Sequence, residues 1–76
     1  MREGDVLRRS TIRLLRSEIH NEEIARQADL DDEGVLRVLS RQAQQRRDSI
    51  DAYARGNRPD LVEKEKAELG IILEYL

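Results

Sequence analysis

Four side chains that could bind phosphate recur near the N-terminus at the spacing of one helical face. They are Arg9, Arg13, Arg16 and His20, separated by four, three and four residues. Residues three and four apart are neighbours on a helix, so the four groups would form one positive row. Such a row could neutralise several phosphates of a nucleic acid, with a steep dependence on salt. The alternative is a solvated charged face, which the pI near 5.4 and the scarcity of aromatic residues for base stacking favour.

Groups that could support catalysis or bind a metal are sparse. The sequence contains no cysteine and one histidine, which makes a disulfide, a thiolate site and metal chemistry improbable. No serine and carboxylate accompany His20 in a recognisable arrangement, and the four glycines are isolated rather than gathered in a phosphate loop. Asp31 and Asp32 could form an acid–base or metal site, but they precede a helical segment and fit an N-cap better. We predict no catalytic residue, metal, cofactor or small-molecule substrate.

Length and composition limit the class of protein. Seventy-six residues are enough for one small domain, residues 1–76, with little margin of stability. No apolar run approaches the roughly 20 residues of a membrane span, and the first residues lack the apolar segment of a secretory signal. We therefore expect a cytoplasmic protein that does not associate with a membrane.

Three helices must position these side chains. The segment GNRP at residues 56–59 marks a sharp bend, because glycine suits the left-handed position after a helix and proline suits the next first turn. A softer break lies at residues 25–32. The predicted fold class is all-α, a small antiparallel bundle whose second and third helices form a hairpin at Gly56–Pro59. The helices are expected at about 5–24, 32–55 and 59–76.

One arginine lies inside the apolar stripe of the second predicted helix. The third helix places Glu65 within its own apolar arc and Glu68 at the edge, and Arg46 and Glu68 each lie eleven residues from residue 57. We expect Arg46 to pair with Glu68 or Glu65, because an unpaired buried guanidinium is strongly destabilising. The alternative is that Arg46 lies at a helix margin and reaches water. The stripe around it consists of Val35, Leu36, Leu39, Ala43, Ile50, Tyr53 and Ala54.

The last residues, LGIILEYL, raise the question of self-association. Ile71 points away from the main apolar arc of its helix, so a second copy of the chain could cover it in a homodimer. Alternatively, Ile71 and Tyr75 close the end of the bundle. The sequence leaves both arrangements open.

Most of the chain closely resembles the YqeY family. The resemblance lies in STIRLLRSEIHNEEI (10–24), LDDEGVLRVLSR (30–41) and the segment from QRRDSI to EYL (45–76). The family comprises small bacterial relatives of the C-terminal part of GatB, the tRNA-engaging subunit of glutamine-dependent amidotransferases. The resemblance implies a bacterial helical domain linked to tRNA-dependent amidotransfer. Its partners would be tRNA or amidotransferase subunits, and a carbon–nitrogen ligase label would follow by association only.

The sequence departs from the family pattern in three respects. Relatives usually begin with a further amphipathic helix, continue past EYL through a proline into a second helical domain, and carry an aliphatic residue where this chain has Arg9. The tRNA-contacting resemblance is usually assigned to that second domain, so we discount the ligase label here. We expect either a fragment or a naturally shortened variant.

Taken together, these patterns predict a non-catalytic helical adaptor of the GatB/YqeY type. One alternative is an RNA-binding module that uses the arginine row. A second alternative is a self-associating structural fragment without activity of its own.

Overall fold

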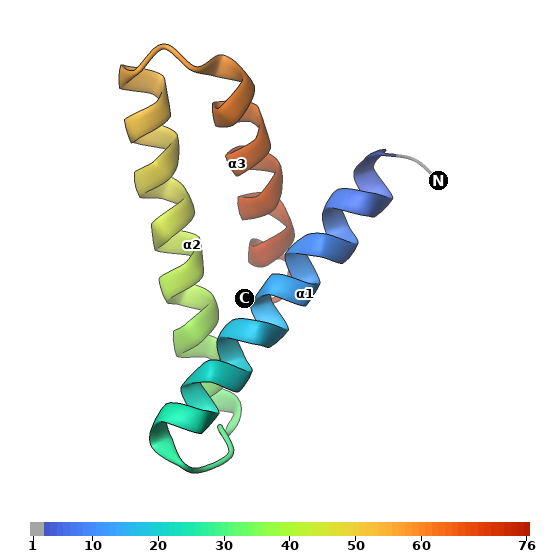
Figure 1. Cartoon of the computed structure of the whole chain (residues 1–76), viewed down its shortest axis with the longest axis vertical. Coiled ribbons are helices and arrows are strands. Elements are labelled where there is room, and N and C mark those ends of the chain that lie inside the picture. Colours follow the sequence, from blue (N-terminus) through green and yellow to red (C-terminus); the bar gives the residue numbers. More distant parts are fainter. Residues whose placement is uncertain (1–2) are drawn as a thin grey trace.

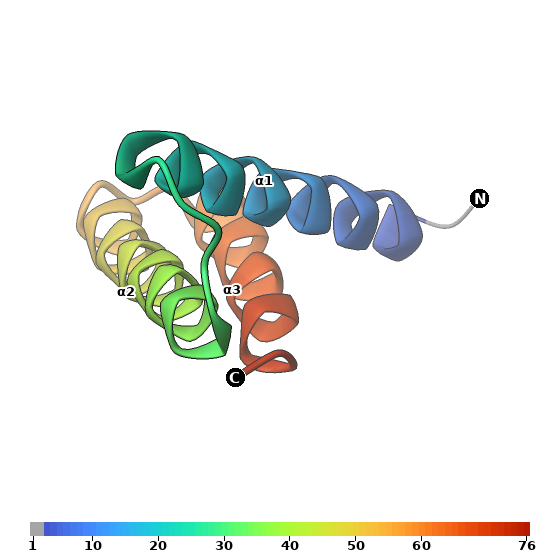
Figure 2. The same cartoon turned by 90° about the horizontal axis from the view of Figure 1, so that it is seen from below.

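The computed structural model describes the backbone from residue 3 and the side chains from residue 4 to residue 76; residues 1 and 2 of the predicted domain lie outside this part. Figure 1 shows α2 and α3 side by side in a hairpin, with α1 crossing it obliquely, and Figure 2 shows that α1 lies across one face of the hairpin. The predicted all-α fold with its hairpin is therefore confirmed. The helices are α1 (Glu3–Arg26), α2 (Asp32–Arg55) and α3 (Pro59–Leu73).

The start of α2 follows from its local sequence. The side-chain oxygen Oδ1 of Asp31 accepts a hydrogen bond of 2.8 Å from the backbone N–H of Gly34, so Asp31 is the N-cap. Asp32 and Glu33 occupy the first turn, where negative charge is favourable beside the positive end of the helix dipole. The cap interpretation of this acidic pair is thus correct.

The hairpin turn differs in one detail from the sequence expectation. Asn57, with φ of 56°, holds the left-handed position, whereas Gly56 has φ of −81°. Asparagine tolerates the left-handed region better than most residues, so it can replace glycine there. The N–H of Arg58 donates to the carbonyl oxygen of Tyr53 at 2.9 Å, and Pro59 begins α3.

The core lies where α1 meets the open end of the hairpin. Val38 is only 2% exposed, whereas Leu36 is 45% exposed, which corrects the predicted stripe of α2. A helical wheel gives the apolar direction of one helix, but burial also depends on where a second neighbour lies. The central cluster consists of Leu15, Leu39, Ala43 and Ile72, with Val35 and Leu69 packed against it.

At the end of α3, the structure bears on the two arrangements that the sequence left open for Ile71. Ile71 is buried, while Leu73, Tyr75 and Leu76 are each about half exposed. α3 ends at Leu73 rather than residue 76, because the last residues form a turn in which the N–H of Tyr75 bonds the carbonyl oxygen of Ile72. Within the part of the chain that the structure describes, no helix is long and apolar enough to span a membrane.

Candidate docking and anion-binding site on the first helix

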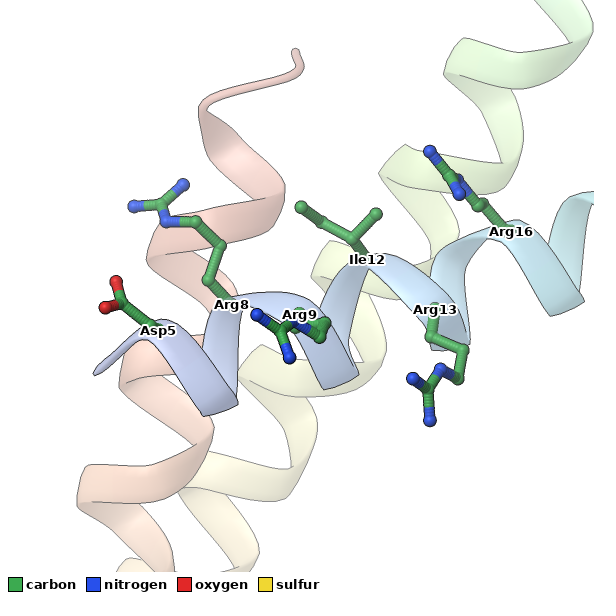
Figure 3. Close-up of a pocket in the computed structure, with 6 residues that line it drawn as sticks. All are labelled: Asp5, Arg8, Arg9, Ile12, Arg13 and Arg16. Atoms are coloured by element: carbon green, nitrogen blue, oxygen red, sulfur yellow. The ribbon is translucent and has the colours of Figure 1, made fainter. Parts of the chain in front are cut away.

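The outward surface of α1 carries an arginine face, which we define as Arg9, Arg13 and Arg16. All three side chains are exposed, and they line a hollow of about 530 Å³ together with Asp5, Arg8 and Ile12 (Figure 3). None of the three forms an ion pair with a carboxylate among the side chains that the structure describes. The structure therefore brings together three of the four predicted phosphate-binding groups as unneutralised cations.

Arg8, the fourth arginine of this hollow, is already neutralised. Its guanidinium forms an ion pair with the carboxylate of Glu74, and its Nη2 donates to Glu74 Oε1 at 3.1 Å. The hydrogen bond from Arg8 lowers the pKa of Glu74, and the same contact raises the pKa of Arg8. This pair joins the N-terminal half of α1 to the turn that follows α3.

The arginine face does not point in a single direction. In Figure 3, the side chains of Arg8, Ile12 and Arg16 project to one side of α1, whereas Arg13 projects to the opposite side. Arg16 thus borders the surface beside Ile12, and Arg13 faces away from it. The predicted single row is better described as a positive face with two edges.

His20 stands apart from the three arginines. It lines a separate hollow of about 440 Å³, together with Glu23, Ile24 and Asp29 among others. The carboxylate of Glu23 accepts a hydrogen bond of 2.9 Å from the backbone N–H of Leu30, which positions it at the end of α1. Because acids share this hollow, His20 does not extend the unneutralised positive surface.

An apolar groove adjoins the arginine face. It has a volume of about 290 Å³ and lies between α1, the first turns of α2 and the C-terminal turn. Ile12 and Arg16 line both the groove and the arginine hollow, so the two share a wall. The groove, as we use the term below, is lined by Ile12, Leu15, Arg16, Ile19, Val35, Leu39 and Tyr75.

This groove was not predicted from the sequence. Ile12 and Ile19 lie seven residues apart, on the same side of the helix, while Leu15 lies nearer the core. The structure leaves Ile12 and Ile19 half-buried and Leu15 buried. The useful signal was the breadth of the apolar arc of α1, which exceeds what one contact can cover.

A second charged cluster lies inside the hairpin and contains the three residues predicted to pair. Arg46 Nε donates to Glu68 Oε2 at 3.0 Å and lies 3.5 Å from Glu65 Oε2. Arg46 Nη1 also donates to Gln42 Oε1 at 3.3 Å. The side chain of Arg46 is 12% exposed, so it does not reach into water as the alternative interpretation required.

The acids of this buried triad, which we define as Arg46, Glu65 and Glu68, outnumber its base. Burial raises the pKa of Glu65, the neighbouring Glu68 charge raises it further, and Arg46 opposes both effects. Two carboxylates with one guanidinium leave an excess negative charge between α2 and α3. No cluster of histidine, cysteine or acidic residues able to hold a metal ion occurs among the residues that the structure describes.

Comparisons with known proteins agree with the sequence resemblance. The model of the family described as "Yqey-like protein" matches residues 1–76. "Altered inheritance of mitochondria protein 41, mitochondrial" from Lachancea thermotolerans is 47% identical over 73 residues, which cover 95% of this chain and 39% of the relative. Its namesake from Vanderwaltozyma polyspora is 41% identical over 73 residues, covering 95% and 40%. The chain spans about two-fifths of the length of these curated relatives.

These relatives overturn two expectations. They are yeast proteins whose names call them mitochondrial, so the predictions of a bacterial protein and of a cytoplasmic location are wrong. The location was inferred from the lack of an apolar secretory signal. Mitochondrial transit peptides are instead amphipathic and rich in arginine and serine, so that criterion could not exclude mitochondria.

Proposed function

The chain belongs to the YqeY family, and we propose that it is a non-catalytic helical adaptor domain that acts in or near tRNA-dependent amidotransfer. The observation that best supports an adaptor is that α1 both packs in the core and carries an exposed surface suited to binding. Its inner side packs on the hairpin through Leu15, an apolar groove runs along its border with α2, and three unneutralised arginines lie on its outward surface. Such a surface suits a macromolecular partner, because it is shallow and extended and mixes apolar and charged groups. The link to amidotransfer rests on the resemblance to GatB.

The buried triad supports the same role from inside the hairpin. Arg46 on α2 contacts Glu65 and Glu68 on successive turns of α3, so sliding one helix along the other would break both contacts. Buried ion pairs specify register more surely than they add stability. We infer that the triad fixes the platform on which α1 is presented.

Direct RNA binding is the second candidate, and the arginine face supports it. Arg9, Arg13 and Arg16 repel one another slightly along the helix, and an external polyanion would offset this repulsion. Guanidinium groups bind phosphate in a bidentate manner. Three phosphate contacts would give a log–log salt dependence with a slope of about −2 to −3. With few aromatic residues available, these contacts would be to the nucleic acid backbone rather than to stacked bases.

A retention experiment with purified components separates the two candidates. The full chain is immobilised at about 50 mM salt and offered tRNA alone, GatB-type amidotransferase subunits alone, or both. An adaptor retains the subunits without needing tRNA. An RNA-binding module retains tRNA alone and loses it in Arg13→Glu, whereas the control Arg47→Glu on exposed α2 surface keeps it. Retention of neither component would contradict both candidates.

A further inference from the structure

We propose that the groove binds an amphipathic helix of a partner protein that carries acidic residues along one flank. This proposal rests on the adaptor function above and names the chemistry of the partner. It combines two features that share a wall: the apolar floor of the groove and the unneutralised charge of Arg16 on its edge.

The dimensions and walls of the groove suit a helix. Its α1 wall runs from Ile12 to Ile19, seven residues or about 10 Å at the helical rise, which matches an apolar stripe at positions i, i+3 or i+4, and i+7. Leu15 and Leu39 form a buried floor, and Val35 provides the facing wall. Helices are the only regular secondary structure among the described residues, so these residues offer no strand edge to an extended peptide.

The positive charge around the groove favours a partner helix with acidic residues along one side. Arg16 lines the groove and has no carboxylate partner among the described side chains, while Arg8 on the same side is held by Glu74. Arg9 adds a second unneutralised cation on the adjoining surface. A helix with acids beside its apolar stripe would pair with these groups, whereas a basic flank would bring like charges together.

A second copy of this chain fits the groove poorly. Large apolar side chains are exposed on α1 at Val6, Leu14 and Ile24. Leu14 lies between Arg13 and Arg16, and Val6 lies one turn before Arg9. Docking α1 of one copy into the groove of another would therefore oppose two sets of arginines. The charges of α1 therefore disfavour this arrangement and favour a helix with acidic residues.

The test uses a synthetic amphipathic peptide of about 18 residues, or five helical turns, with leucines in one stripe and glutamates along one flank. Its twin carries lysine in place of each glutamate. Binding of each labelled peptide to the full chain is measured by fluorescence anisotropy. We expect the glutamate peptide to bind at least about tenfold more tightly than the lysine twin, and high salt to reduce the difference.

Matched variants locate the binding surface. Arg16→Glu should weaken binding of the glutamate peptide by about tenfold. The control Arg13→Glu makes the same change of charge on the opposite side of α1 and should alter the affinity for this peptide by less than about twofold. Ile19→Gln should weaken both peptides, with circular dichroism to verify folding. Because Arg16 is exposed, we expect Arg16→Glu to fold, so the test can still be read if Ile19→Gln unfolds.

Several outcomes would overturn the proposal. The first two are equal affinity for the two peptides and an equal loss of peptide affinity in Arg13→Glu and Arg16→Glu. The other two are self-association of the chain, or binding of tRNA, that the variant Ile19→Gln abolishes. The last two would assign the groove to a second copy or to RNA.

If the peptide fails to bind while purified amidotransferase subunits are retained, the groove is not the binding site and the adaptor function stands. If the peptide binds while subunits and tRNA are not retained, the groove stands and the link to amidotransfer falls.

Discussion

The arginine of the buried triad and those of the arginine face are chemically identical, but their surroundings differ. Arg46 is 12% exposed and contacts two carboxylates and an amide, whereas Arg9, Arg13 and Arg16 are exposed and have no acidic partner among the described side chains. A buried charge must be paired within the protein because desolvation is expensive, while an exposed charge is hydrated at little expense. The first kind therefore determines structure, and the second remains available for binding.

The comparison predicts that removing Arg46 is the most damaging single change. Arg46→Met leaves two mostly buried carboxylates without their counter-charge, and we expect a loss of about 3 kcal/mol in the free energy of unfolding at pH 7. Urea denaturation measures the loss. The loss should shrink as the pH falls and Glu65, whose pKa is raised by burial, takes up its proton.

The control for this change is Arg47→Met, on the exposed side of the same helix, which should alter stability by less than about 0.5 kcal/mol. If Arg46→Met were as stable as the parent and kept the same hairpin register, the triad would not specify the structure.

Glu65→Gln should have a smaller effect of the opposite sign. The folded-state pKa of Glu65 is raised above its unfolded value, so the folded protein binds this proton more tightly. Its contribution to stability is present below the unfolded pKa and is lost as pH rises through the folded pKa. We therefore expect Glu65→Gln to stabilise the protein at pH 7 by about 0.5 kcal/mol and to flatten this part of the pH profile.

Denaturation at pH 4 and pH 7 checks the sign. Glu63→Gln is the matched control on the exposed side of α3, and it should alter stability by less than about 0.5 kcal/mol. A loss of stability in Glu65→Gln at pH 7 would mean that its contact with Arg46 outweighs burial and repulsion by Glu68.

Neutralising the arginine face should hardly affect stability. The triple variant Arg9→Gln, Arg13→Gln and Arg16→Gln removes hydrated charges, so we expect a change within about 0.5 kcal/mol, or a slight gain from reduced repulsion. Thermal unfolding at low and high salt measures it. A large loss would show that these arginines have structural partners, and the contrast with Arg46 would disappear.

The smallest effect on stability is expected for the Arg8–Glu74 pair. Arg8 is paired like Arg46 but exposed like the arginine face. The pKa of Glu74 is lowered, so its contribution to stability is present above the unfolded pKa and is lost as pH falls through the folded pKa. Arg8→Gln should slightly lower the urea midpoint at neutral pH and low salt, with no effect at pH 2 or in high salt. An equal effect at all salt concentrations would mean that Arg8 acts through packing.

The features that the sequence predicted are those that depend on one helix or on one hairpin. The cap at Asp31 depends on three adjacent residues, and the pairing of Arg46 with Glu65 and Glu68 depends only on counting from the bend. The features that it missed depend on how α1 crosses the hairpin. Helix crossing angles follow from the interlocking of side chains on both surfaces, which the periodicity of one sequence does not specify.

The packing of the three helices accounts for two of the differences, because it buries Val38 rather than Leu36 and covers Ile71. The acidic neighbours of His20, Glu23 and Asp29, instead lie close to it in the sequence. The groove is a product of the crossing of α1 over the hairpin. The surface proposed for binding was therefore the part of the molecule least accessible to reasoning from the sequence.

The opposite shifts of Glu65 and Glu74 give the molecule an ordered response to acid. During a titration from neutral pH, Glu65 takes up its proton before Glu74, and the repulsion between Glu65 and Glu68 on α3 falls. Glu74 is protonated later, and its ion pair with Arg8 is then lost while α1 stays packed on the hairpin through Leu15. Acid would thus relieve a charge inside the hairpin before it weakens an ion pair on the surface.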